Sequence, residues 1–210
     1  TLKAGTSMDL TATVDVSTAA TGTISMDAEG GALTMDGSVN VTASTSSLRV
    51  AANGDITLGN LTATNVSVVS ANGAILNAVG TTLNVSATNL RLAASDEIGV
   101  SGRHLTIDVV TLTASSAIAS GDGIYLTESN AVTVDTVRVV VTDFTATAGT
   151  MTVTDASQSD LKTSGGDGNI VLVAAGAIVL NDGTDGLGAV GEDNTDGTAV
   201  SANGSGSVLI

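Results

Sequence analysis

The chain repeats itself, and this internal repeat limits the available folds more than any other feature of the sequence. The segment 48–56, Leu-Arg-Val-Ala-Ala-Asn-Gly-Asp-Ile, aligns without gaps to the segment 90–98, Leu-Arg-Leu-Ala-Ala-Ser-Asp-Glu-Ile, at an offset of 42 residues. A weaker copy lies between them, so the apolar residue after the turn is Ile56, then Ile75, then Ile98. These spacings of 19 and 23 residues predict a unit of about 21 residues.

Each unit contains short segments in which apolar and polar residues alternate, the pattern of half-buried β-strands. Clear examples are 39–41, 83–85, 105–107 and 132–134, and looser copies of the unit are 22–26, 149–153, 168–172 and 175–180. Strands of about three to five residues are short for a sandwich but fit a solenoid, in which equivalent strands of successive coils pair in parallel. We therefore expect an all-β parallel β-helix of about 21-residue coils, with Ile56, Ile75 and Ile98 stacked inside it.

The composition agrees with this fold. The hydrophobic residues, 42% of the chain, are nearly all Ala, Val, Leu and Ile, with one Tyr, one Phe and no Trp. A core of small aliphatic side chains suits a thin, repetitive interior. Pro is absent, and a strand with a neighbour on each side needs every backbone N–H that Pro lacks.

Asn-Gly pairs at 53–54, 72–73 and 203–204 support a rival interpretation. This dipeptide is typical of two-residue hairpin turns, which would predict an antiparallel sandwich array. Its recurrence as Ala-Asn-Gly shortly before Ile favours stacked corners of a solenoid instead, with Gly or Asn at positive φ.

The sequence resembles the filamentous-haemagglutinin-like, haemagglutinin-repeat exoproteins of bacteria and related giant repetitive surface proteins. The resemblance covers roughly residues 20 to 180 and depends on the Gly-Asp-Ile-Thr-Leu step at 54–58, the shortened Gly-Ile-Tyr-Leu step at 123–126, the Leu-x-Val-x-Ala strands and the segment 123–132. It implies a right-handed parallel β-helix, export across the bacterial envelope, and a role in adhesion, aggregation or cell-surface structure. That family contributes no catalytic residues.

Charge and composition exclude several partners. Six Lys and Arg against 21 Asp and Glu give a net charge of −15, which repels phosphate backbones, so we expect no nucleic-acid partner. No apolar run approaches the length of a membrane span. The absence of Cys excludes disulfides and thiolate metal sites, and it fits an exported bacterial protein.

Catalytic groups are sparse, and we expect no enzyme activity. The closest approach to an acid/base group is the set of carboxylates at 96–97 and 108 near Arg103 and His104, which we interpret as a solvated turn. The six cations are scattered in the sequence, and a single His excludes triads or metal sites that need several. A carbohydrate-active β-helix enzyme stays a lesser alternative, and it requires carboxylates on one face.

The acidic, Gly-rich segment 181–197 is the most distinctive local feature. Glu192, Asn194 and Asp196 have the oxygen-ligand spacing that opens an EF-hand-type calcium loop, although the twelfth position is Asn203 rather than Glu. The alternatives are a calcium-dependent binding module and a plain surface loop without a cofactor.

The first hypothesis is a non-catalytic structural or adhesive segment of an extracellular or cell-surface bacterial protein. Residues 1–180 would form the coils, 181–206 an acidic Gly-rich loop region, and 207–210 the start of a further strand, with the chain an excerpt of a longer protein. Its partners would be further coils of the same chain or neighbouring copies, joined end to end in a filament. Loops at 157–169 and 181–206 would contact cell-surface ligands.

Overall fold

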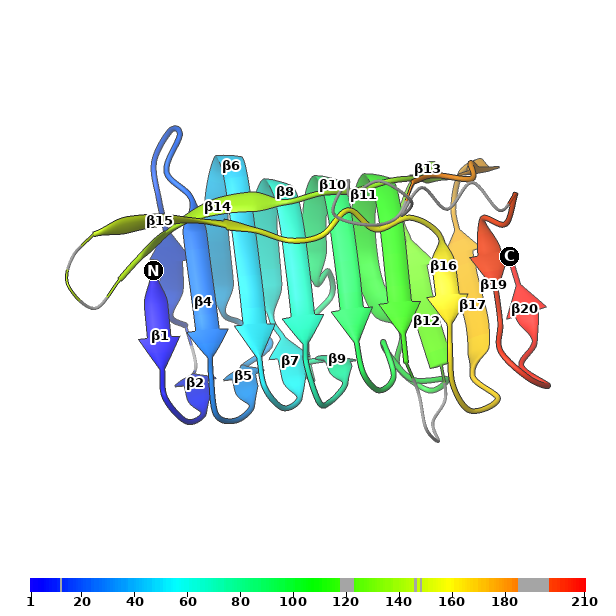
Figure 1. Ribbon diagram of the computed structural model, residues 1–210, viewed down its shortest axis with the longest axis horizontal. Helices are drawn as coiled ribbons and strands as arrows, with labels where there is room; N and C mark the ends of the chain where they lie inside the picture. The colour runs from blue at the N-terminus through cyan, green and yellow to red at the C-terminus, as the bar shows by residue number, and fades with distance from the viewer. Residues whose placement is uncertain (12, 118–122, 146, 148, 185–196) are drawn as a thin grey trace.

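The computed structural model describes residues 1–11, 13–117, 123–145, 147, 149–184 and 197–210. These residues contain twenty β-strands and no helix, which confirms the all-β prediction. Almost all of the strands pair in parallel and form one long stack (Figure 1). No helix in the described part of the chain is long and apolar enough to cross a membrane.

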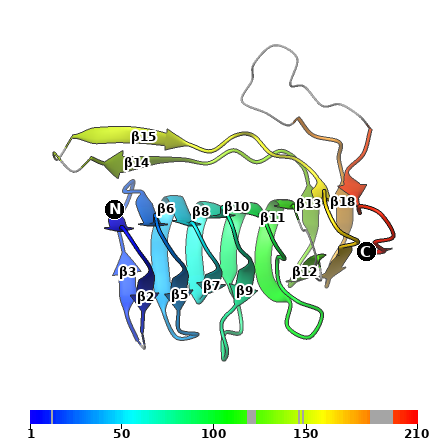
Figure 2. The same cartoon turned by 60° about the horizontal axis from the view of Figure 1, so that its bottom comes forward.

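The described strands form three columns, in which each strand pairs with the strand of the next pass of the chain (Figures 1 and 2). The first column contains β1 (Leu2–Ala4), β4 (Ile24–Ala28), the second halves of β6 (Asn40–Ala52), β8 (Asn60–Ser70), β10 (Val85–Ala94) and β11 (Leu105–Ser116), then β16 (Leu161–Thr163) and β19 (Val200–Ser201). The second column contains β2 (Met8–Leu10), β5 (Leu33–Met35), β7 (Ile56–Leu58), β9 (Ile75–Asn77), a bridge at Ile98, β12 (Gly123–Glu128), β17 (Asn169–Ala174) and β20 (Val208–Leu209). The third contains β3 (Asp15–Ser17) and the first halves of β6, β8, β10 and β11, while β13 (Val132–Val134) and β18 (Ile178–Leu180) extend the middle of β11.

An aliphatic ladder occupies the inner side of the second column. Its register partners, in order, are Met8, Leu33, Ile56, Ile75, Ile98, Ile124, Ile170 and Val208. The predicted stack of Ile56, Ile75 and Ile98 is thus confirmed, and all three side chains are fully buried. Each such burial contributes about 1.5–3 kcal/mol of hydrophobic stabilisation.

The 42-residue offset between the two best copies of the repeat is also explained by the register of strand pairing. Leu48 pairs with Val66, and Val66 pairs with Leu90, so the two best copies of the repeat lie two strands apart in the first column. All three side chains are buried in the same hydrophobic core. The arrangement is consistent with a β-helix-like fold.

Several strands are much longer than the predicted three to five residues. β6 has 13 residues, β8 has 11 and β11 has 12, because each passes from the third column into the first without leaving the ladder. A register shift between Ala43 and Ser47 lets β6 turn this corner while it stays paired to β8. Such irregularities bend a strand without ending it.

Stacked corners replace the hairpin turns of the rival interpretation. The amide N–H of Asn72 donates to the Asn53 carbonyl at 2.9 Å, and the Asn72 Nδ2 donates to the Asn53 Oδ1 at 2.7 Å. The expected positive φ is absent at Gly54 and Gly73 and present at Gly204. Glycine is needed at 73 for space instead, since a Cβ there would lie 2.6 Å from the backbone nitrogen of Asp55.

One insertion interrupts the columns. The chain leaves the stack after β13 and forms an antiparallel hairpin from β14 (Val140–Phe144) and β15 (Thr150–Thr154), then rejoins the stack at β16. The segment 149–153 is therefore not a further strand of the repeat, and that interpretation was wrong. Its alternating pattern is shared by parallel and antiparallel strands, so the pattern alone does not identify the partner.

Candidate functional site

The insertion lies along the outer face of the first column (Figures 1 and 2). We call the described residues between 137 and 158 the strap. It runs back from β11 towards β1, and β14 packs against β4 and β6. A small apolar cluster of Val137, Val139 and Val141 is buried within it. The strap covers a face of the sheet that would otherwise meet solvent.

Beneath the strap, one row of outward side chains alternates between small hydroxyls and arginine. The register partners in this row are Ser25, Arg49, Ser67, Arg91 and Thr113. The three hydroxyl residues are buried, although they point away from the aliphatic core. Buried polar groups need partners. Arg91 Nη1 donates to Ser67 Oγ at 3.5 Å and Gln158 Nε2 of the strap donates to Thr113 Oγ1 at 3.1 Å, whereas Ser25 Oγ has no hydrogen-bond partner among the described residues.

Two arginines of this row bind the return strand of the strap. Arg49 Nε donates to Asp155 Oδ1 at 3.0 Å, and Arg91 Nε donates to the Ala156 carbonyl at 3.1 Å. Next to them, Gln158 Nε2 donates to the Leu92 carbonyl at 2.8 Å. Arg49 and Arg91 follow the leucine that begins each copy of the repeat. They therefore anchor the strap at the same level of the sheet, two strands apart.

The far end of the strap is fastened to the edge strand β1. Lys3 Nζ lies 3.1 Å from Asp143 Oδ2, and Asp143 is buried. Burial alone would raise the pKa of Asp143, but hydrogen bonds from Thr1, from the Phe144 amide and from Lys3 outweigh it, so the pKa lies below its usual value. The hydrogen bond to Asp143 in turn raises the pKa of Lys3.

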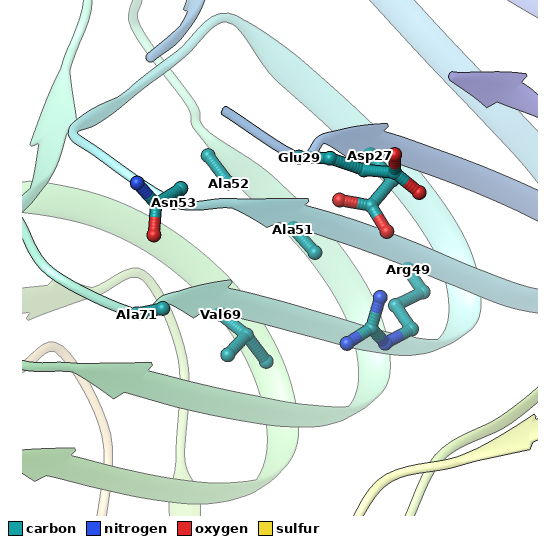
Figure 3. Close-up of a pocket in the computed structure, with 8 residues that line it drawn as sticks. All are labelled: Asp27, Glu29, Arg49, Ala51, Ala52, Asn53, Val69 and Ala71. Atoms are coloured by element: carbon teal, nitrogen blue, oxygen red, sulfur yellow. The ribbon is translucent and has the colours of Figure 1, made fainter. Parts of the chain in front are cut away.

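A groove opens beside the strap anchors (Figure 3). Its volume is about 300 Å³, and its lining residues are Asp27, Glu29, Arg49, Ala51, Ala52, Asn53, Val69 and Ala71. Desolvation raises the pKa of Asp27, while the nearby charges of Arg49 and Lys3 lower it and those of Glu29 and Asp143 raise it. A carboxyl with a raised pKa beside a second carboxylate is an acid/base arrangement, and it also occurs in structural ion networks.

The end of β12 pairs with the first half of β11 and so continues the third column, where a buried carboxyl interrupts the aliphatic series. Glu128 is the register partner of Ile107, and its two oxygens accept the backbone N–H groups of Val109 at 3.0 Å and Asn130 at 2.9 Å. Burial raises its pKa, and those hydrogen bonds oppose the rise. The contacts are local to the fold, so we assign Glu128 a structural role.

The predicted calcium ligands Glu192, Asn194 and Asp196 lie outside the described residues, so calcium binding stays a prediction. Within the described residues, no three His, Cys, Asp or Glu side chains are grouped so as to hold a metal ion. At the border of the acidic segment, Asp182 Oδ2 accepts the amide N–H of Gly197 at 2.8 Å.

His104 and Asp108, two members of the acid/base group considered from the sequence, each contact a residue outside that group. His104 Nδ1 lies 3.0 Å from Thr127 Oγ1, and its ring stacks at a tilt 5.4 Å from the ring of Tyr125. Asp108 Oδ1 instead accepts a hydrogen bond from Asn130 Nδ2 at 2.8 Å. Arg103 forms a tight turn through reciprocal backbone hydrogen bonds with Val100, as expected for a surface turn.

Comparison with protein-family models, with curated proteins and with solved structures gives no match for this chain. The function of the chain is therefore inferred from the geometry of the columns, the strap and the groove.

Proposed function

We propose that the chain is a closed, right-handed parallel β-helix of roughly 21-residue coils that serves as a non-catalytic structural or adhesive segment of an extracellular or cell-surface bacterial protein. Its mechanical task is to stack end to end, with further coils of the same chain or with neighbouring copies. The observation that carries the proposal is that the inner ladder of the second column, fully buried along its middle, ends on a partly buried Met8 at one end and on an exposed Val208 at the other.

At one end, the ladder opens into an apolar depression. A cavity of about 550 Å³ is lined by Leu2, Lys3, Ala4, Ser7, Met8, Asp9, Leu10, Val14 and Val16. Met8 begins the ladder of the second column, and Leu2 begins the inward row of the first column. Apolar surface of this kind is stabilised when another apolar layer covers it.

At the other end, the same rows finish on exposed aliphatic side chains. Val208 is 47% exposed and Leu209 is 61% exposed, whereas the ladder residues from Leu33 to Ile170 are fully buried. The inward row that begins at Leu2 finishes at Val200. If two copies stack, Val208 of one meets Met8 of the next, and Val200 meets Leu2.

Backbone complementarity supports the same arrangement. An edge strand carries a row of N–H and C=O groups that pair readily with another strand. β1 and β2 present such edges at one end, and β19 and β20 present them at the other. Because all four belong to parallel ladders, a head-to-tail contact continues each column with the same polarity.

A carbohydrate-active site is the second candidate, favoured by one observation: Asp27 and Glu29 line a common groove. Carboxylates, a guanidinium and an amide all hydrogen bond to sugar hydroxyls. The lining contains no aromatic platform of the kind that sugars stack on. Hydrolysis assays on polysaccharide panels with the wild type and D27N/E29Q test this candidate; turnover that the double variant loses would replace the structural proposal.

Sedimentation velocity and negative-stain imaging over a concentration series test stacking. We expect linear particles whose length grows with concentration. Substitution of an end residue, Val208→Asp, should abolish them, because it would place a charge in the buried ladder of the junction. The matched control is Val79→Asp, at a side chain that is 82% exposed on the flank. A compact monomer at every concentration would refute the proposal.

A further inference from the structure

The cations of this acidic chain gather on one face of the sheet. Four of the six Lys and Arg residues lie on strands of the first column, in two adjacent outward rows of register partners: Lys3, Arg49, Arg91 and Lys162. We call the surface that they share the basic face. The outward positions that alternate with the two arginines carry hydroxyl groups, on Ser25, Ser67 and Thr113. A chain with a net charge of −15 therefore carries a local basic surface.

The strap already places acidic groups on the basic face. Its Asp155 binds Arg49, and its Asp143 binds Lys3. A backbone carbonyl of the strap accepts a hydrogen bond from the second arginine of the row. The strap is thus an acidic occupant of the basic face, supplied by the chain itself.

This occupant fits the face incompletely. Asp155 is only 8% exposed, yet its Oδ2 has no hydrogen-bond partner among the described residues, while its Oδ1 accepts from Arg49. Ser25 Oγ is buried in the same row and also has no partner in the described part of the chain. Buried polar groups without partners destabilise the state that buries them. A carboxylate that meets a guanidinium through both oxygens binds it more strongly than one that uses a single oxygen.

The strap can leave the sheet without opening the main core. Its apolar cluster of Val137, Val139, Val141 and Val153 is separate from the core cluster of the columns. Ion pairs of Asp143 and Asp155 and hydrogen bonds of Gln158 are among its anchors to the sheet. A segment held in this way opens at a lower free energy than the core does. Its departure uncovers the row of arginines and hydroxyls and takes two carboxylates away from the basic face.

We propose that the basic face binds an acidic polysaccharide, and that the strap covers this site and is displaced by the ligand. Hydroxyl groups on every second strand suit a ligand that carries hydroxyls along its whole length. Arg49 and Arg91 lie two strands apart, about 9.6 Å at the usual strand spacing. This distance is close to the length of a disaccharide, so the ligand carries a carboxylate on every second sugar.

The sheet favours a polysaccharide over an acidic peptide. The arginines lie on β6 and β10, and each of these strands pairs with a neighbour on both sides. The basic face therefore offers no free backbone edge, the feature by which a sheet binds an extended peptide. This inference does not depend on end-to-end stacking, and it adds a ligand to the adhesive role.

Two neutralising substitutions in one ion pair test the inference on the full chain. The probe is a fluorescently labelled, unsulfated hyaluronan octasaccharide, in which a uronate alternates with a neutral sugar, and binding is measured by anisotropy at fixed ionic strength. We expect Asp155→Asn to bind the probe about tenfold more tightly than the wild type, because more of the protein has an open strap. Arg49→Gln should bind it about tenfold more weakly, because the site itself loses a cation. If the pair served only to hold the strap, both variants would change affinity in the same direction.

The controls separate the site from net charge. Asp36→Asn and Arg103→Gln make the same changes of net charge at exposed positions outside the basic face, and both should leave the affinity unchanged. A neutral chitin oligosaccharide of equal length should not bind. In the complex with hyaluronan, the strap amides of residues 139–144 and 150–155 should lose protection against hydrogen exchange.

Several results would overturn the inference: no probe binding by the wild type and Asp155→Asn, a shift of both ion-pair variants in the same direction, or unchanged protection of the strap in the complex. Tighter binding of an oligoglutamate peptide than of hyaluronan would also overturn it, because the ligand would then be a protein. These variants leave the end residues Met8 and Val208 intact. Failure here therefore leaves end-to-end stacking in place, and failure of stacking leaves this site in place.

Discussion

Arg49 and Asp155 form an ion pair with a 3.0 Å contact that fastens the strap to the outer face of the sheet, and both side chains are largely buried. They are 106 residues apart in sequence. The pair joins an arginine of the repeat to an inserted segment that does not follow the repeat. The strap is therefore part of the folded stack.

Removal of Arg49 should destabilise the protein. Arg49→Ala leaves Asp155 buried without its cation, and such a loss typically costs about 3–5 kcal/mol. We expect chemical denaturation to show a fall of that order in the free energy of unfolding, with faster proteolysis of the strap. Arg103→Ala, in the exposed turn with Val100, is the matched control and should change the unfolding free energy little. Equal stability of the two variants would show that the anchor is unimportant.

The aliphatic ladder gives the second prediction. Ile75 is fully buried between Ile56 and Ile98, so Ile75→Ala should create a cavity and cost about 2–5 kcal/mol. Val79→Ala, four residues later on the exposed flank, should cost less than about 0.5 kcal/mol. The difference is measured as a shift in the midpoint of denaturant unfolding. A shift at Ile75 as small as that at Val79 would mean that the ladder is not a packed core.

Asn84 gives the third prediction, because its amide is buried and fully used. Its Nδ2 donates to the Leu58 carbonyl at 2.9 Å and to Asn77 Oδ1 at 3.1 Å, and its Oδ1 accepts the amide N–H of Thr106 at 3.0 Å. Asn84→Ala leaves these groups unsatisfied and should cost about 2–4 kcal/mol. Asn72→Ala, at an exposed corner, should cost about 1 kcal/mol or less. Thermal melts of the two variants compare the sites directly.

The fourth prediction concerns acid. The folded-state pKa of Asp143 lies below its ordinary value of 3.8, so its contribution to stability is fully present above that value. The contribution is lost as the pH falls through the lowered folded-state pKa, because the protonated carboxyl no longer pairs with Lys3. The protection of the strap amides against hydrogen exchange, relative to their intrinsic exchange rate at each pH, should therefore fall at acid pH in the wild type. In Asp143→Asn this protection should be low already at neutral pH, and wild-type protection there would contradict the assignment.

The sequence predicted the parts of the fold that depend on local periodicity. Ile56, Ile75 and Ile98 are spaced as successive members of the ladder. The 42-residue offset between Leu48 and Leu90 corresponds to two steps of strand pairing. Both features therefore follow from the sequence alone. The lengths of β6, β8 and β11 were not predicted. These strands bend at a corner without a Gly or Pro, the residues by which a sequence usually indicates a turn.

The candidate site was largely missed, for a physical reason. Arg49 and Arg91 stand at matching positions in the aligned repeat, yet the six cations were interpreted as scattered. Their partners, Asp155 and the Ala156 carbonyl, lie in a distant insertion, and one partner is a backbone group without any sequence signature. The recurrence of arginine at an outward position of the repeat was the one signal that could have identified the row.

The central claim is that the columns of one copy continue into the next, and a disulfide across the junction tests it most directly. Asp9 and Leu209 follow the two end members of the ladder, Met8 and Val208, and they point outward at opposite ends of the second column. Stacking would bring them about 4.8 Å apart on adjacent strands, within the range that a disulfide requires. The native chain has no Cys to interfere.

Oxidation of D9C/L209C should therefore give a ladder of covalent dimers, trimers and longer species on a non-reducing gel, while each single variant gives no species above a dimer. The reduced samples should all run as monomers. If the double variant forms no more than the dimers of the single variants under conditions where the protein is folded, the columns do not continue from copy to copy, and end-to-end stacking is wrong.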